Sequence, residues 1–149
     1  MTVYVNNRKA KFNFEILETM EAGLVLYGFE VKSIRQGKAK LDGSYVVVRG
    51  GEAFLVGAII SPYQAVNTPK DYDRERARQL LLSKKELARL EQQTETARLT
   101  AVPLKLYNKG RYIKLELAIV RGKKKHDKRE TLKKRDSQRE ISRILKTQY

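Results

Sequence analysis

The residues best suited to chemistry are lysines that alternate with tyrosines beside a predicted turn. Side chains alternate between two faces along a strand, which places Lys105, Tyr107, Tyr112 and Lys114 on one face of a strand pair that turns at residues 108–110. Lysines neutralise phosphates and tyrosine rings stack on bases, so this face is suited to nucleic-acid binding. The two tyrosines are equally compatible with a place inside the fold, and the alternation leaves both interpretations open.

The charge of the chain also points to a polyanion. The 149 residues include 32 Lys and Arg against 17 Asp and Glu, which gives a formal net charge of +15. About half of this excess, +8, lies in residues 121–149, and the other +7 is spread over residues 1–120. Nucleic acid is the leading candidate for the partner, and an anionic membrane surface is the alternative.

Composition and motifs argue against most catalytic machinery. The chain has no cysteine and a single histidine, which excludes disulfides, thiol catalysis and histidine-rich metal sites. It carries no phosphate-binding loop, no metal-ligand spacing and no paired-carboxylate motif. We therefore expect a protein that is not an enzyme and uses neither a cofactor nor a metal. Since there is no apolar run of 18 residues and no secretory signal over residues 1–11, we expect a cytoplasmic protein.

Local patterns in the first half predict short helices and strands. Phe14, Leu17 and Met20 follow a candidate N-cap, Asn13, at helical spacing, which predicts a helix over residues 13–21. The further elements expected there are a strand over 24–27, a helix over 29–36 ended by Gly37, strands over 44–48 and 53–56 around a Gly50–Gly51 turn, and a loop over 61–75. The pattern assigns no role to the loop.

The second half contains the clearest local signals. Ser83 and Glu86 fit a capping box, which predicts a helix over residues 84–95 after a strand over 79–82. A second hairpin joins residues 99–107 and 111–121, where Ile113, Leu115, Leu117 and Ile119 alternate with Tyr112, Lys114, Glu116 and Ala118. About six short strands with three short flanking helices predict a mostly β (α+β) fold, a small closed antiparallel OB-like barrel.

The C-terminal segment reads as a separate basic tail. We expect the barrel to span residues 1–121 and the tail to span 122–149, with Gly122 as the hinge. Large apolar residues in the tail are too few to offset about 1–2 kcal/mol of backbone ordering entropy per residue. Ile141, Ile144 and Leu145 nevertheless share one helical face, so we expect a tail that is disordered when free and helical on a polyanion. A plain solubility tail is the alternative.

Three single residues have competing interpretations on local grounds. Glu21 reads first as a surface ion pair, although a carboxylate can also accept hydrogen bonds from a base edge. Leu81 lies in a run of three leucines and reads first as core. His126 is flanked by lysines and reads first as solvated, although an imidazole can stack on a base.

Several motifs, in order along nearly the whole chain, resemble the SsrA-binding protein (SmpB) family. They are EAGL at residues 21–24, GFEVKS at 28–33, RQGK at 35–38, SY at 44–45, GEA at 51–53, LLL at 80–82 and GKKKHDKR at 122–129. The resemblance implies an RNA-binding protein that holds the tRNA-like domain of transfer-messenger RNA (tmRNA) and delivers it to stalled ribosomes for trans-translation. It also implies a tail that folds into a helix in the mRNA path, near the decoding centre and 16S ribosomal RNA.

The resemblance further implies which residues meet RNA. Asn7, Glu21, Leu81 and Lys114 fall where the family contacts or supports tmRNA. To these we add cations and aromatics of the body, namely Lys9, Lys11, Lys32, Arg35, Lys38, Tyr107 and Tyr112. The ribosome-binding residues expected in the tail are Gly122, Lys123, Lys124, Lys125, His126, Asp127, Lys128, Arg129, Lys133, Ile144 and Leu145.

Other function classes remain as alternatives. A ribosomal or other structural rRNA-binding protein would fit the charge and the tail, but it would sediment with every ribosome. A nuclease is disfavoured because acid and metal-binding groups are missing. A membrane-surface protein would need a cleaner amphipathic tail than this one, so we expect no membrane partner, and we expect a monomer.

Overall fold

The computed structural model describes residues 2–64 and 68–123 as strands with three α-helices. The strands are β1 Val3–Asn6, β2 Phe14–Leu24, β3 Ala39–Lys40, β4 Tyr45–Arg49, β5 Glu52–Val56, β6 Ile59–Ile60, β7 Arg78–Leu81, β8 Thr100–Lys109 and β9 Tyr112–Gly122. The helices are α1 Arg8–Asn13, α2 Gly28–Arg35 and α3 Lys84–Glu91, with a π-helical turn Gln92–Thr96 after α3.

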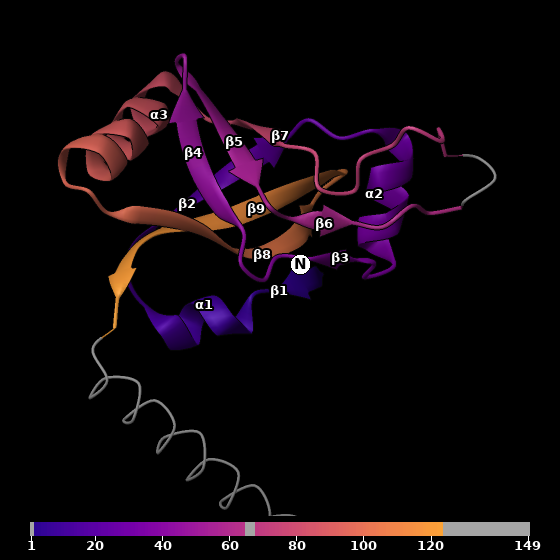
Figure 1. Cartoon of the computed structure of the whole chain (residues 1–149), viewed down its shortest axis with the longest axis horizontal. Helices are drawn as coiled ribbons and strands as arrows, with labels where there is room; N and C mark the ends of the chain where they lie inside the picture. Colours follow the sequence, from indigo (N-terminus) through magenta and orange to yellow (C-terminus); the bar gives the residue numbers. More distant parts are fainter. Residues whose placement is uncertain (1, 65–67, 124–149) are drawn as a thin grey trace, which may run out of the picture.

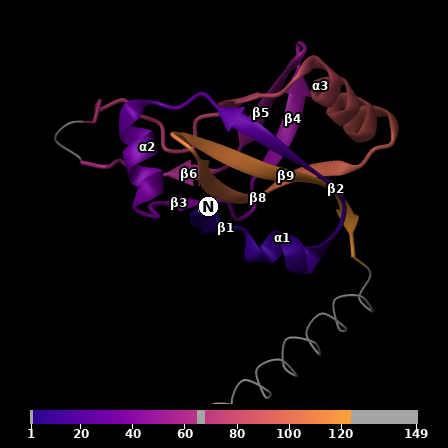
Figure 2. The same cartoon turned by 180° about the vertical axis from the view of Figure 1, so that it is seen from behind.

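Six antiparallel strands form a closed ring. Their order is β8-β4-β5-β7-β2-β9, and β9 pairs with β8 again; β1 adds to β8 from the side. Closure leaves the ring without a free edge to aggregate, which confirms the closed antiparallel fold expected from the sequence. In both views α2 and α3 lie at opposite ends of the ring, and α1 lies beneath it (Figures 1 and 2).

The core fills the inside of the ring. Leu115, Leu117 and Ile119 of β9 are at most 1% exposed, as their alternation predicted. Ala118 was expected on the solvated face, and that prediction is wrong. This residue is fully buried in a second, smaller cluster with Ala10 of α1, because the helix covers the outer face of the sheet at that point.

The predicted helix over residues 13–21 is wrong, because this segment is the strand β2. It pairs with β9 from Phe14 to Gly23, and the register shifts between Ile16 and Glu18. This irregularity interrupts the two-residue alternation, which leaves apolar residues at a spacing that resembles a helix. Pairing along two long strands outweighs the weak local preference of the segment.

The chain forms its first helix earlier than expected. Asn7 caps α1 through its Oδ1, which accepts a hydrogen bond from the Ala10 N–H at 3.3 Å. The strand predicted over 24–27 is also wrong beyond Leu24, because β2 ends there and residues 25–27 belong to no strand. Tyr27 instead serves as the N-cap residue of α2.

Several predicted turns and caps are confirmed. Gly37 follows α2 at φ +73°, and Gly50 and Gly51 turn the first hairpin at φ +58° and +74°. Ser83 and Glu86 form the capping box of α3. The second hairpin turns at Gly110 and Arg111. Its first strand ends two residues later than predicted and its second begins one residue later, because Lys109 still pairs with Tyr112.

A buried ionic network fastens the segment before β7 to α2. The Glu30 carboxylate of α2 and the Arg78 guanidinium of β7 are both 0% exposed and 2.8 Å apart. Arg76 forms a second ion pair with Glu30, and the Tyr72 hydroxyl donates to Glu30 Oε2 at 2.7 Å. Burial raises the pKa of Tyr72 to about 12, with a further contribution from the Glu30 charge, so Tyr72 stays protonated as a donor.

Candidate nucleic-acid interface

A row of side chains crosses the outer face of four neighbouring strands. The register pairs Leu81 of β7 with Gly23 of β2, Gly23 with Lys114 of β9, and Lys114 with Tyr107 of β8. A methyl group at Gly23 would lie 3.3 Å from Leu81 Cβ and 3.6 Å from Lys114 Nζ. The glycine therefore leaves room for the lysine between its neighbours.

Leu81 is 55% exposed in this row, although its position in a leucine run suggested a core residue. Its neighbour Leu80 faces the core and is 3% exposed, as the opposite faces of a strand require. The row thus combines an exposed apolar side chain with a cation. This combination suits an RNA that presents both a phosphate and the flat face of a sugar or base.

Glu21 lies beside this row and is held in place by two donors. The Tyr107 hydroxyl donates to Glu21 Oε2 at 2.5 Å, and Lys109 Nζ donates to Oε1 at 3.1 Å. The hydrogen bond from Tyr107, and then that from Lys109, lower the pKa of Glu21. The group is therefore an ionised, positioned acceptor that keeps lone pairs for a further donor.

The two tyrosines of the lysine face play different parts. Tyr107 is only 3% exposed, with Lys105 Nζ 5.3 Å from its ring centre, so of the two interpretations left open the structure supports a place inside the fold, and we assign it to positioning Glu21. Tyr112 is 71% exposed, and Lys114 Nζ lies 6.0 Å from its ring centre. Its ring is free to stack on a base next to a cation.

Helix α2 brings further cations beside the hairpin turn. Arg35 Nη2 donates to the Arg111 carbonyl at 3.4 Å, which connects the end of α2 to the turn between β8 and β9. Lys32 and Lys38 approach the ring of Tyr63, at 5.6 and 5.9 Å from its centre. Of the cations predicted on α2 and in the segment after it, Arg35 therefore adjoins the hairpin, while Lys32 and Lys38 lie at Tyr63. We call the surface formed by Glu21, Leu81, Tyr112 and Lys114 the Glu21 face.

The predicted contacts in the N-terminal segment lie elsewhere. Lys9 and Lys11 belong to α1, beneath the ring, where Lys9 Nζ is 3.8 Å from Asp42 (Figure 1). Asn7 is 3% exposed and donates through Nδ2 to the Pro103 carbonyl at 2.8 Å. Its amide is used inside the protein, so any contribution of Asn7 to RNA binding is by support of the fold.

The start of the tail lies next to α1. Gly122 ends β9, and Lys123 donates from Nζ to the Lys11 carbonyl at 3.0 Å. The remaining tail residues predicted to meet the ribosome lie outside the described residues. These are Lys124, Lys125, His126, Asp127, Lys128, Arg129, Lys133, Ile144 and Leu145.

Sequence reasoning missed three residues of this interface. Lys109 was assigned to a turn, but alternation with Lys105 and Tyr107 could have placed it on their face. Gly23 was given no role of its own, and its place between Leu81 and Lys114 depends on the pairing of three strands. Tyr63 lies in a loop without periodicity, so no local signal indicated it.

None of the helices within residues 2–64 and 68–123 has the length and apolar character needed to cross a membrane. The same part of the chain contains no cluster of three or more His, Asp or Glu side chains placed to hold a metal ion.

Comparison with known proteins identifies the family. A family model described as "SmpB protein" matches residues 4–147. The chain belongs to the SmpB family. Similar SmpB relatives named "SsrA-binding protein" occur in Chelativorans sp. (strain BNC1), with 54% identity over 98% of this chain and 94% of the relative, and in Microcystis aeruginosa, with 49% identity over 97% and 94%.

The SmpB fold is also found among solved structures. A solved chain from "tmRNA-SmpB: a journey to the center of the bacterial ribosome" is 42% identical, with a TM-score of 0.67, and the match covers 88% of this chain and 95% of that one. The family resemblance read from the sequence motifs is thereby confirmed.

Proposed function

We propose that this protein binds the tRNA-like domain of tmRNA and delivers it to stalled ribosomes for trans-translation, which rescues the ribosome and tags the unfinished peptide. The observation that carries the proposal is the SmpB family match over residues 4–147, supported by relatives named SsrA-binding protein. The solved neighbour described with tmRNA at the ribosome supports both partners. The protein acts by binding in the cytoplasm and catalyses no reaction.

The Glu21 face can recognise RNA by three kinds of contact. Lys114 neutralises a phosphate, Tyr112 stacks on an unpaired base, and Glu21 accepts hydrogen bonds from a base edge. A cationic surface alone binds any RNA. A positioned carboxylate adds selectivity, because it repels phosphates and forms a hydrogen bond only with a donor at the right place.

The tail supplies the second partner in this proposal. Residues 124–149 carry ten Lys and Arg against four Asp and Glu, a density of charge suited to an RNA-lined channel. We assign them to the mRNA path and decoding centre of the ribosome, with Ile144 and Leu145 as the apolar side of a helix that forms there. Ordering on the ribosome would supply the free energy that the free tail lacks.

The RNA that co-purifies with the untagged protein from its own cells tests the proposal. We expect tmRNA in a stoichiometric amount, and enrichment of the protein on stalled ribosomes only. If the protein instead sediments with all ribosomes and carries no tmRNA, it is a structural rRNA-binding protein and the proposal is wrong.

Glu21→Ala is expected to weaken tmRNA binding by about tenfold or more, although it raises the net charge by one. The loss reflects a base-edge acceptor worth roughly 1–3 kcal/mol. Binding of a tmRNA transcript measured by fluorescence anisotropy checks this. Glu18→Ala is the matched control, since it removes a carboxylate from the same strand that is paired only with Arg89, and it should bind as tightly as the wild type. Equal affinities for both variants would contradict the role of Glu21.

A further inference from the structure

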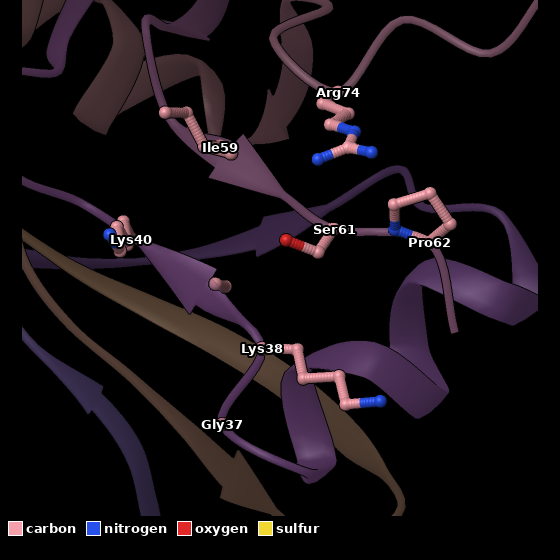
Figure 3. A pocket seen from close by; sticks show the side chains of 8 residues that line it. Gly37, Lys38, Lys40, Ile59, Ser61, Pro62 and Arg74 are labelled. Carbon is pink, nitrogen blue, oxygen red and sulfur yellow. The ribbon is translucent and has the colours of Figure 1, made fainter. Parts of the chain in front are cut away.

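A cationic cleft lies between the small β3–β6 sheet and the segment that leads to β7. It has a volume of about 560 Å³, and Figure 3 shows Lys38, Lys40 and Arg74 around it together with the Ser61 hydroxyl. The three cations come from two segments more than 30 residues apart in the chain, so only the fold brings them together. All three are exposed to solvent.

The charges of this cleft are unbalanced within the part of the chain that the structure describes. There, no Asp or Glu oxygen lies within 4.0 Å of the side-chain nitrogens of Lys38, Lys40 or Arg74. Two cations near the Glu21 face, Lys105 and Lys109, instead each pair with a glutamate. Three uncompensated positive charges around one cleft attract an anion.

The backbone that carries these cations is held in place. Lys38 accepts a hydrogen bond at its carbonyl from the Ser61 N–H, at 3.0 Å. Arg74 accepts two at its carbonyl, from the Ile60 N–H at 3.1 Å and from Arg78 Nη2 at 2.9 Å. The positions of the two walls are therefore set by the fold before any ligand binds, which lowers the entropy cost of binding.

An aromatic ring beside the cleft indicates the kind of anion. Tyr63 follows Ser61 by two residues, and Nζ of the cleft residue Lys38 lies 5.9 Å from the centre of its ring. Lys32 approaches the same ring at 5.6 Å. A flat ring with cations beside it suits a nucleotide, whose base stacks while its phosphate meets the charges. An isolated phosphate would make no use of the ring.

The end of α2 connects the cleft to the hairpin that carries Tyr112. Arg35 donates to the Arg111 carbonyl at the hairpin turn, and Lys38, three residues later, lines the cleft. Two cations therefore lie between the hairpin turn and the cleft. This arrangement favours the RNA held at the Glu21 face as the occupant.

We infer that the cleft of Lys38, Lys40, Ser61 and Arg74 binds a backbone phosphate of tmRNA, with a neighbouring base stacked on Tyr63. The inference rests on the proposed function and adds a second RNA subsite, away from Glu21. The phosphate accepts hydrogen bonds from Lys40, from Arg74 and from the Ser61 hydroxyl.

The tmRNA affinity of the full-length variant K40A/R74A tests the subsite, and K84A/K85A is the matched control. The control removes two exposed lysines from the first turn of α3, at the opposite end of the ring, and leaves the same net charge (Figure 1). We expect K40A/R74A to weaken tmRNA binding about tenfold or more and to reduce the log–log salt slope by roughly 0.7–0.9 for each phosphate that the variant no longer neutralises. The control should change affinity by less than about threefold.

Phosphate-modification interference on tmRNA locates the bound phosphate. Ethylation of one or two defined phosphates should weaken binding of the wild type and have no effect on K40A/R74A. Y63L should lose roughly 5- to 150-fold in affinity, as expected when a base no longer stacks on the ring. Thermal unfolding of each variant should match the wild type, because all three side chains are surface groups.

The outcomes separate this inference from the proposed function. A wild type that fails to bind tmRNA overturns the proposed function. If the wild type binds but K40A/R74A behaves as K84A/K85A does, only the subsite is wrong. A loss confined to ribosome binding, or strong competition by inorganic phosphate with no effect in Y63L, also overturns the subsite.

Discussion

Deletion of residues 124–149 is expected to abolish peptide tagging while tmRNA affinity falls by less than about threefold at physiological salt. The reason is that the Glu21 face and the cationic cleft both lie on the folded ring, whereas the deleted segment is assigned to the ribosome. The cut belongs after Lys123, because Arg121 and Gly122 still pair with β2 and Lys123 N donates to the Asn13 carbonyl at 3.0 Å.

Two measurements check this division. Anisotropy with a tmRNA transcript gives the affinity, and a stalled-ribosome translation assay gives tagging. I144A/L145A is the matched control, since it keeps every charge of the tail and removes only the apolar side of the expected helix. It should bind tmRNA as the wild type does and tag poorly. If the deletion removes most of the tmRNA affinity, the assignment of tmRNA binding to the ring and of ribosome binding to the tail is wrong.

A tail that is already helical in the free protein would contradict the proposal that the tail folds on the ribosome. The proposal requires residues 128–146 to gain helix on the ribosome. An NMR spectrum of the free protein with a packed, exchange-protected helix over these residues would show that no such ordering remains to be made.

Elements set by local chemistry were predictable from the sequence. The Gly50–Gly51 turn requires two positive φ angles, which glycine adopts readily, and the capping box of Ser83 and Glu86 satisfies its own backbone groups. The alternation in β9 predicted its buried face because the strand is regular. The strand β2 was missed because its irregularity near Leu17 removes that alternation, and only the long pairing with β9 decides its structure.

The sequence predicted which side chains of the interface share a face of the hairpin. It did not predict how exposed each of them is. Alternation correctly placed Lys105, Tyr107, Tyr112 and Lys114 on one side of the hairpin. It could not show that Tyr107 is covered and bonded to Glu21, because β1 pairs with β8 at that residue and Glu21 lies 86 positions away. Burial depends on neighbours that the local sequence does not contain.

The cationic cleft could not be predicted from the sequence at all. The Arg74 carbonyl is held by the Ile60 N–H of β6 and by Arg78, which also pairs with Glu30 on α2, and β6 pairs with β3, which carries Lys40. A charged residue in an irregular loop gives no local signal of these long-range contacts. The buried ion pair is therefore one of the contacts that position the wall of the cleft.

Glu30→Gln is expected to lower the free energy of unfolding by about 3–5 kcal/mol, the largest stability effect we expect for a single substitution here. The change leaves the Arg78 guanidinium buried without its counter-charge, and one of the two acceptor oxygens that Arg76, Arg78 and Tyr72 share becomes an NH2 donor. Glu15→Gln is the matched control. Its partner Arg121 is exposed, so this variant should unfold close to the wild type. Urea unfolding at neutral pH measures both.

The same pair gives a pH dependence with a definite sign. Burial alone would raise the pKa of Glu30, but the hydrogen bonds from Arg76, the Tyr27 N–H, Arg78 and Tyr72 outweigh it and leave the pKa lowered. A carboxyl whose pKa is lower in the folded state stabilises the protein above its unfolded pKa, and this stabilisation is lost as the pH falls through the folded value. The wild type should therefore lose stability in acid more steeply than Glu30→Gln.

Loss of the Glu30 charge should also weaken the binding of tmRNA. The Arg74 backbone is held through Arg78, so Glu30→Gln should weaken tmRNA binding at the cleft even at temperatures where the variant is folded. A Glu30→Gln protein that unfolds like Glu15→Gln would show that the buried pair contributes little. It would also show that the cleft is positioned by its backbone hydrogen bonds alone.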